Sequence, residues 1–209
     1  MTSAFEAFTR LKEGNKRFAA HVAGDNIPLH QTKPTELTKI QEPVAIILGC
    51  SDARVPAEII FDQGLGDLFV IRVAGNIVAP SQVGSVEFAA SRFGTRLVVV
   101  VGHSECGAIL ATLEALQNPG ANQSRNLASI VDRVRPSVES LVDSGMAGDQ
   151  LVRKAVRANI RTSTDHLRHG SQILEQLIQD EGLLVVGAEY SLETGVVDFF
   201  DGAPTREMK

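Results

Sequence analysis

The chain has 209 residues, of which 44% are hydrophobic and 22% charged, a balance typical of a globular domain with a substantial core. Its net charge is -5, and the sequence has no basic stripe that could neutralise phosphates, which argues against nucleic acid as the main partner. No stretch approaches the roughly 20 apolar residues of a membrane span, and the N-terminal residues lack a secretory-signal pattern. We therefore expect a cytoplasmic protein with no membrane partner. The only two cysteines cannot form a disulfide framework and, in a reducing compartment, are free to bind metal.

The first predicted element is an amphipathic helix that begins near Ser3 and ends before Gly24. Apolar residues recur in it at near-helical spacing, and Ser3 and Glu6 have the spacing of a capping box. Residues 24–43 are polar and contain three prolines, which predicts an extended segment. We expect a single domain over 1–209, with a helical arm and extended segment over 1–43 and a core over 44–209. The arm either packs on a partner subunit or covers its own domain.

Short apolar runs rich in β-branched residues predict the strands of the core. The first four do not alternate with polar residues, which is typical of parallel strands buried on both faces. The fifth follows a short connection and is expected to pair antiparallel with the fourth. The runs are Val44–Leu48, Leu68–Val73, Leu97–Val101, Leu183–Ala188 and Val196–Phe200.

Helical patterns separate these strands. They run from Pro56 toward Phe61, over Ser81–Phe93 and Cys106–Gln117, and over Leu127–Gln179 with a break near residues 145–148. Strands that alternate with helices predict an α/β fold. We expect an open, mostly parallel sheet of four strands plus an antiparallel C-terminal strand, flanked by helices, with the N-terminal helical arm added.

Three residues at the ends of predicted strands have the chemistry of a metal site. Cys50 lies just past the first strand, and His103 and Cys106 lie just past the third. In open α/β sheets the carboxyl ends of the strands meet where ligands bind, so we expect the three side chains to converge. Two thiolates and one imidazole with an open fourth position are typical of catalytic zinc. The sequence predicts one Zn²⁺ per chain.

Asp52 and Arg54 follow Cys50 closely. A carboxylate beside a dication can ligate it, accept a hydrogen bond from its bound water, or pair with an arginine. Pairing with Arg54 keeps Asp52 ionised and leaves the fourth metal position to water.

The segments Cys50-Ser51-Asp52-Ala53-Arg54-Val55 and Gly102-His103-Ser104-Glu105-Cys106-Gly107 resemble the two signature motifs of the β-class carbonic anhydrases. The resemblance extends to residues 67–72 and 74–76. It implies that Cys50, His103 and Cys106 bind zinc beside the catalytic pair Asp52 and Arg54. It also implies substrate-binding roles for Gln41, Phe69 and the backbone N–H of Gly107.

The activity implied by this resemblance is reversible hydration of CO2 to bicarbonate and a proton by zinc-bound hydroxide, the carbonate dehydratase reaction of a zinc lyase. A separate hypothesis comes from the short Cys-x-Asp-x-Arg spacing: Asp52 would be a conditional fourth ligand, which moves onto zinc at low pH when Arg54 releases it. The resemblance also implies a homodimer or homotetramer. Three alternatives stay open: a zinc hydrolase of carbonyl sulfide or carbon disulfide, a zinc-binding protein without catalysis, and a thiol redox protein using Cys50 and Cys106.

Two departures from the family pattern affect secondary features. Ile47 stands where one subgroup has a tryptophan that helps form an extra bicarbonate site, although Arg72 matches the arginine of that site. Phe88 stands where some members have a tyrosine, so a hydroxyl contact from that position is absent.

Overall fold

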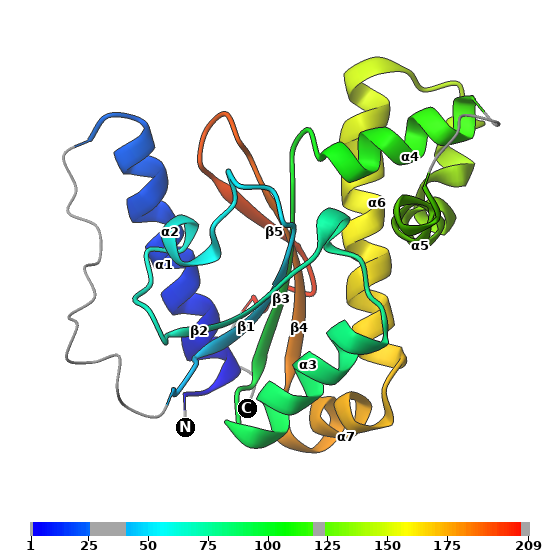
Figure 1. Ribbon diagram of the computed structural model, residues 1–209. Helices are drawn as coiled ribbons and strands as arrows, with labels where there is room; N and C mark the ends of the chain where they lie inside the picture. Colours follow the sequence, from blue (N-terminus) through cyan, green and yellow to red (C-terminus); the bar gives the residue numbers. More distant parts are fainter. Residues whose placement is uncertain (1, 26–40, 119–123, 206–209) are drawn as a thin grey trace.

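A computed structural model describes residues 2–25, 41–118 and 124–205 (Figure 1). Most of the predicted extended segment, residues 26–40, lies outside the described residues. Among the described helices, none combines the length and the apolar character needed to cross a membrane.

The strands form one five-stranded sheet in the order β2-β1-β3-β4-β5, which confirms the predicted fold class. β1, β2, β3 and β4 are parallel, and β5 pairs antiparallel with β4. After β1 the chain forms β2 on one side of it and then crosses to form β3 on the other side. The carboxyl ends of β1 and β3 therefore form a topological switch point. The strand bounds are Ala45–Gly49 (β1), Leu68–Arg72 (β2), Leu97–His103 (β3), Leu184–Tyr190 (β4) and Val197–Asp201 (β5).

Helices cover both faces of the sheet, in three layers (Figure 1). Every residue of β1 and β3 is buried, because alternate side chains enter two separate cores. α1 and α2 lie over one face, and the larger group of helices lies over the other. The helices are Ala4–Val22 (α1), Ala57–Ile60 (α2), Pro80–Arg92 (α3), Gly107–Gln117 (α4), Arg125–Val142 (α5), Gly148–His169 (α6) and Gln172–Glu181 (α7), with a 3-10 turn at Ala74–Asn76 (η2).

α1 packs on its own domain. The predicted capping box is present, with Ser3 and Glu6 bonding each other's backbone N–H groups. The buried amide of Asn15 donates to the carbonyls of Ile60 and Gly195, at 3.0 and 2.9 Å. Its oxygen accepts the N–H of Val197 at 2.8 Å. These three bonds tie α1 to α2 and to the hairpin between β4 and β5.

The predicted helix over Leu127–Gln179 contains two breaks rather than one. Besides the break near residues 145–148, α6 ends at Gly170 and α7 begins after Ser171. The hydroxyl of Ser171 accepts the N–H of Leu174, which is the usual signal for a helix start. A Cβ at Gly170 would lie 2.5 Å from the carbonyl oxygen of His166, so glycine fits this tight turn.

Candidate metal centre

The switch point of the sheet brings the predicted ligands together. Gly49 is in register with Val101 on the neighbouring strand, so Cys50 and His103 leave the sheet at nearly the same level. Cys106 follows a short turn and is the N-cap residue of α4. The ligand atoms of the three residues lie within 4.8 Å of one another, which fits a single metal ion.

The donor set is buried, and its imidazole nitrogen is left without a hydrogen-bond partner among the described residues. Cys50, His103 and Cys106 are 5%, 0% and 1% exposed. Nδ1 of His103 donates to the carbonyl of Ser104 at 2.9 Å, which leaves Nε2 as the lone-pair nitrogen. That Nε2 atom is buried without a hydrogen-bond partner among the described residues. A buried imidazole nitrogen facing two thiol sulfurs is what zinc coordination requires, so the residues present fit the metal.

Electrostatics of the two thiols also favour a cation between them. The Sγ atoms of Cys50 and Cys106 are 3.9 Å apart, and the pKa of Cys50 lies well below its usual range, chiefly because of a hydrogen bond from Cys106. The pKa of Cys106 is raised, because loss of its proton would remove that bond and leave two adjacent negative charges in a buried site. Burial alone would lower the pKa of His103, but the neighbouring Cys50 sulfur, the bond to Ser104 and the Asp52 carboxylate together outweigh burial and raise it. A dication removes the repulsion that keeps the second thiol protonated.

Asp52 and Arg54 form the predicted pair at the outer side of the centre. The Arg54 guanidinium donates to both carboxylate oxygens, at 3.0 and 2.8 Å, and its backbone N–H adds a third bond. These hydrogen bonds hold the pKa of Asp52 well below its usual range, so the carboxylate is ionised. One of its oxygens is 3.8 Å from Nε2 of His103, and it therefore faces the metal position. The side chain of Arg54 is 56% exposed.

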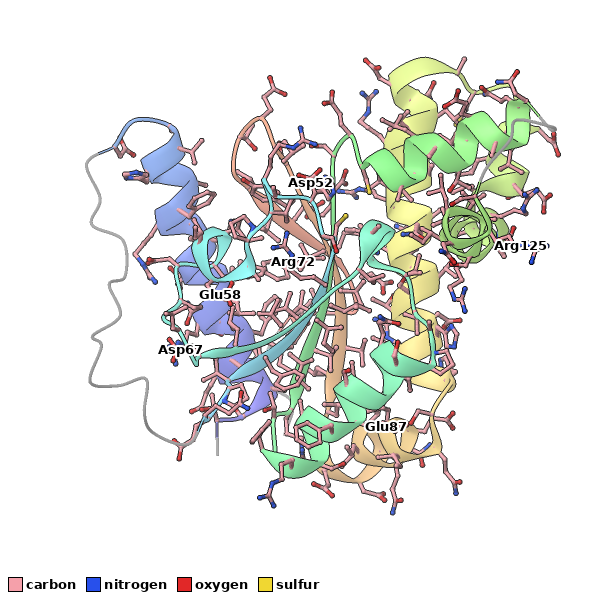
Figure 2. The ribbon with its side chains drawn as sticks, viewed as in Figure 1. Asp52, Glu58, Asp67, Arg72, Glu87 and Arg125 are labelled. Atoms are coloured by element: carbon pink, nitrogen blue, oxygen red, sulfur yellow. The ribbon has the colours of Figure 1, made fainter. Side chains whose placement is uncertain are left out.

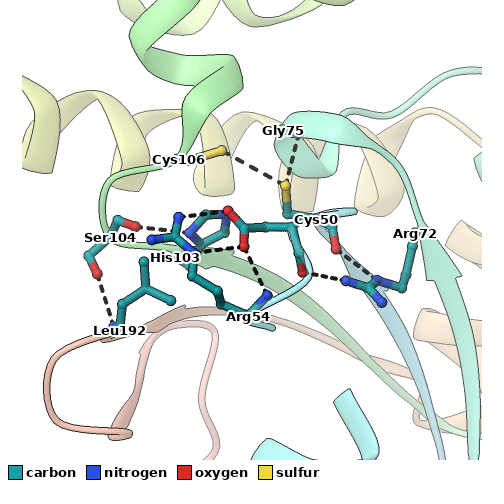
Figure 3. A network of polar contacts seen from close by, with 9 residues as sticks. Cys50, Arg54, Arg72, Gly75, His103, Ser104, Cys106 and Leu192 are labelled. Carbon is teal, nitrogen blue, oxygen red and sulfur yellow. Dashed lines mark hydrogen bonds and ion pairs between the residues drawn. The ribbon is translucent and has the colours of Figure 1, made fainter. Parts of the chain in front are cut away.

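Several further contacts support the centre and were not predicted (Figure 3). Arg72 donates to the carbonyls of Cys50 and Asp52, which ties β2 to the first metal loop. Leu192, in the β4–β5 hairpin, donates its N–H to the hydroxyl of Ser104 at 3.0 Å. The labelled Arg72 and Asp52 lie together at one end of the sheet in Figure 2. The signal in the sequence was the position of Arg72 at the end of a predicted strand.

The N–H of Gly75 donates to Sγ of Cys50 at 3.4 Å. The adjacent Gly-Asn pair after a predicted strand is a turn signal at the same edge of the sheet, and it was available in the sequence.

The expected substrate-binding residues are divided between two ends of the sheet. Gly107 is the first residue of α4, next to Cys106, where backbone N–H groups have no helical partner. Phe69 is in register with Ile46 on the neighbouring strand. Ile46 is four residues before Cys50, so Phe69 lies about 13 Å from Cys50 along the strand direction, at about 3.3 Å per residue. Gln41 is exposed and precedes β1, whereas Cys50 follows it, so the strand alone separates them by about 16 Å. Within one chain these two side chains do not reach the metal centre.

Comparisons with known proteins agree with this geometry. A family model described as carbonic anhydrase matches residues 45–197. A carbonic anhydrase of Mycolicibacterium smegmatis is 39% identical over 196 residues, covering 92% of this chain and 91% of the relative. Carbonic anhydrase 2 of Mycobacterium tuberculosis is 38% identical over 199 residues, covering 93% of this chain and 91% of the relative. The relatives give no support to a carbonyl sulfide hydrolase, a non-catalytic zinc protein or a redox protein.

Solved structures share the fold. A β-carbonic anhydrase of Aspergillus fumigatus is similar with a TM-score of 0.72 at 24% identity, over 94% of this chain and 92% of that chain. A tetrameric β-carbonic anhydrase of Sordaria macrospora gives 0.70 at 23% identity, over 90% and 93%.

Fold and site together define an α/β protein with a buried Cys–His–Cys metal centre at a topological switch point. With the family match over most of its length, the chain belongs to the β-carbonic anhydrase family. The family predicted from the two motifs is thereby confirmed.

Proposed function

We propose that this chain catalyses the reversible hydration of CO2 to bicarbonate and a proton, with one zinc ion held by Cys50, His103 and Cys106. The observation that carries the proposal is the buried, convergent donor set, whose imidazole nitrogen has no hydrogen-bond partner in the part of the chain that the structure describes. When bound, zinc acts as a Lewis acid that activates a water molecule for attack on CO2.

The residues around the donor set then have distinct tasks. Asp52, kept ionised by Arg54, accepts a hydrogen bond from the attacking water and orients it. The buried surroundings of the thiols exclude competing bulk water. Gly107 offers a backbone N–H with no partner within the helix at the start of α4, where the helix dipole favours the negative charge that develops on the substrate oxygen.

Gln41 and Phe69 serve the metal centre of a second copy of the chain in this proposal. Their distance from the centre of their own chain supports this assignment, and so does the exposed edge of the sheet. β2 is an edge strand, and Phe69 packs with Phe88 and Phe93 at centroid distances of 6.2 and 6.0 Å. Phe88 is 53% exposed, which leaves an aromatic cluster open beside an unpaired strand edge. A homodimer, or a tetramer built from it, covers this surface.

Unpaired buried cysteines fit a reducing, cytoplasmic location.

Asp52 is also the proposed conditional fourth ligand of zinc. Its carboxylate faces the metal position, and among the described side chains it is Arg54, from the same loop, that holds it away. If Arg54 released it, the carboxylate would hold the fourth metal position in place of water, and the enzyme would be inactive.

The reaction is tested by stopped-flow measurement of CO2 hydration on protein of known zinc content, across the neutral and alkaline range. Zinc-loaded wild type is expected to be active, and Cys106→Ser is expected to lose both zinc and activity. A fully zinc-loaded wild type that is inactive at every pH overturns the proposal.

The role of a second copy is tested by mixing two defective variants. Cys106→Ser lacks its own metal centre but keeps Gln41, and Gln41→Ala keeps its metal centre. If Gln41 acts across the interface, mixed oligomers contain an intact site and recover activity that neither variant has alone. If it acts within its own chain, mixing recovers nothing.

A further inference from the structure

The turn η2, which follows β2, has an unusual backbone. Gly75 and Asn76 are both in the left-handed region, with φ of 71° and 44°. This region is costly for a residue with a Cβ such as Asn76, and a conformation of this kind persists only when its surroundings hold it. The turn is buried, since Asn76 is 1% exposed.

Two side chains of α6 hold this turn. The amide of Asn159 donates to the carbonyl of Gly75 at 2.8 Å, and the hydroxyl of Ser163 donates to the carbonyl of Asn76 at 3.0 Å. Each left-handed residue therefore has its carbonyl bound by one α6 side chain, from positions one helical turn apart. Asn159 and Ser163 are 2% and 4% exposed, on a helix face that otherwise packs into the apolar core. Polar groups on such a face are costly unless their bonding is specific.

The other side of the same turn faces the metal centre. The N–H of Gly75 donates to Sγ of Cys50, as the dashed line that begins at the Gly75 label in Figure 3 shows. Space also fixes the residue type, because a Cβ at Gly75 would lie 3.0 Å from the Cβ of Ala108 on α4. The direction of this N–H depends on the left-handed turn, and the turn depends on the two α6 side chains.

We propose that Asn159 and Ser163 are positioning residues for the metal centre, which act by holding η2 so that the Gly75 N–H bonds the Cys50 sulfur. The inference rests on the zinc site proposed above. An N–H donor withdraws electron density from a ligand sulfur and keeps it in place, and such outer contacts tune bound metals. Neither residue is near a ligand in sequence, since Asn159 follows Cys106, the nearest ligand, by 53 positions.

The test compares Asn159→Leu with a matched control, Thr164→Val, on the same helix. Thr164 is 0% exposed and its hydroxyl donates to Asp201 at 2.9 Å, away from η2. Both changes remove buried hydrogen bonds from α6, but only the first disturbs the turn. Two properties are measured on folded protein: the rate at which a chelator removes zinc, and the sulfur-to-metal charge-transfer band of the cobalt-substituted protein.

We expect Asn159→Leu to lose zinc at least about tenfold faster than wild type and to shift the cobalt band to lower energy. Thr164→Val should match wild type in both. If the two variants behave alike, the inference is overturned, although the zinc site stands. If Asn159→Leu does not fold, the same two measurements are made on Ser163→Ala. An unshifted cobalt band and an unchanged rate of zinc loss in Ser163→Ala would refute the inference. A wild type that binds no zinc or cobalt refutes the proposed function instead.

Discussion

Replacing Asn15 with leucine should destabilise the protein by about 3 kcal/mol. The change preserves approximate volume on α1 but removes three buried hydrogen bonds, to the carbonyls of Ile60 and Gly195 and from the N–H of Val197. A buried hydrogen bond contributes about 1 kcal/mol, and a backbone group left unpaired adds a desolvation cost. Three bonds therefore give about 3 kcal/mol, with more if the backbone cannot relax.

Urea unfolding measures this change in the free energy of unfolding. The control is Lys12→Leu, an exposed position on the same helix, where a change within about 0.5 kcal/mol is expected. Because Asn15 contacts its own domain, the loss relative to wild type should be the same at low and high protein concentration. Zinc should also leave Asn15→Leu faster, since the hairpin that Asn15 anchors holds Ser104 beside His103.

A loss below about 1 kcal/mol would refute this reasoning, because it would mean that the three bonds contribute little in solution. A loss that appears only at high concentration would show that α1 packs on a partner subunit, which is the other role left open by the sequence.

Two further predictions concern the centre itself. Arg54→Met should leave zinc content unchanged but reduce CO2 hydration at least about tenfold, compared by stopped flow with Arg92→Met at another exposed arginine. Equal activity in the two variants would mean that the Arg54 pair has no part in the reaction. Removal of zinc followed by air oxidation should join Cys50 and Cys106, whose sulfurs are 3.9 Å apart, in an intramolecular disulfide that zinc prevents. Thiol counting and intact mass measure this, and persistence of both thiols in the metal-free protein would contradict it.

Much of the sheet was predictable because its physics is local. In an α/β protein, a short continuous run of β-branched residues is typical of a parallel strand buried on both faces. The observed strands begin and end within two residues of the predicted ones. The break at Gly170 was missed because the apolar period continues from α6 into α7. Gly170 and the serine cap at Ser171 were the only local marks of it.

The three ligands were predictable for a different reason, namely the rule that places parallel strand ends at one edge. Asn159 could not be found in this way. Its partner is the carbonyl of Gly75, and a bond between a side chain and a distant backbone group leaves no periodicity in the sequence. Gln41 and Phe69 show another limit, because resemblance assigns a residue to a site without saying which copy of the chain holds that site.

The contacts around the centre differ in how firmly they hold it. Cys50 is reached by hydrogen bonds from β2 and η2, and the loop that carries His103 is tied to the β4–β5 hairpin. All of these partners belong to elements packed in the core or bonded to it. The Asp52–Arg54 pair is different, since both partners belong to one loop and the arginine is more than half exposed. Rearrangement there disturbs no core packing, whereas movement of a thiolate ligand does. We therefore propose that any change of ligand at this centre takes place at the fourth metal position, where it costs the fold least.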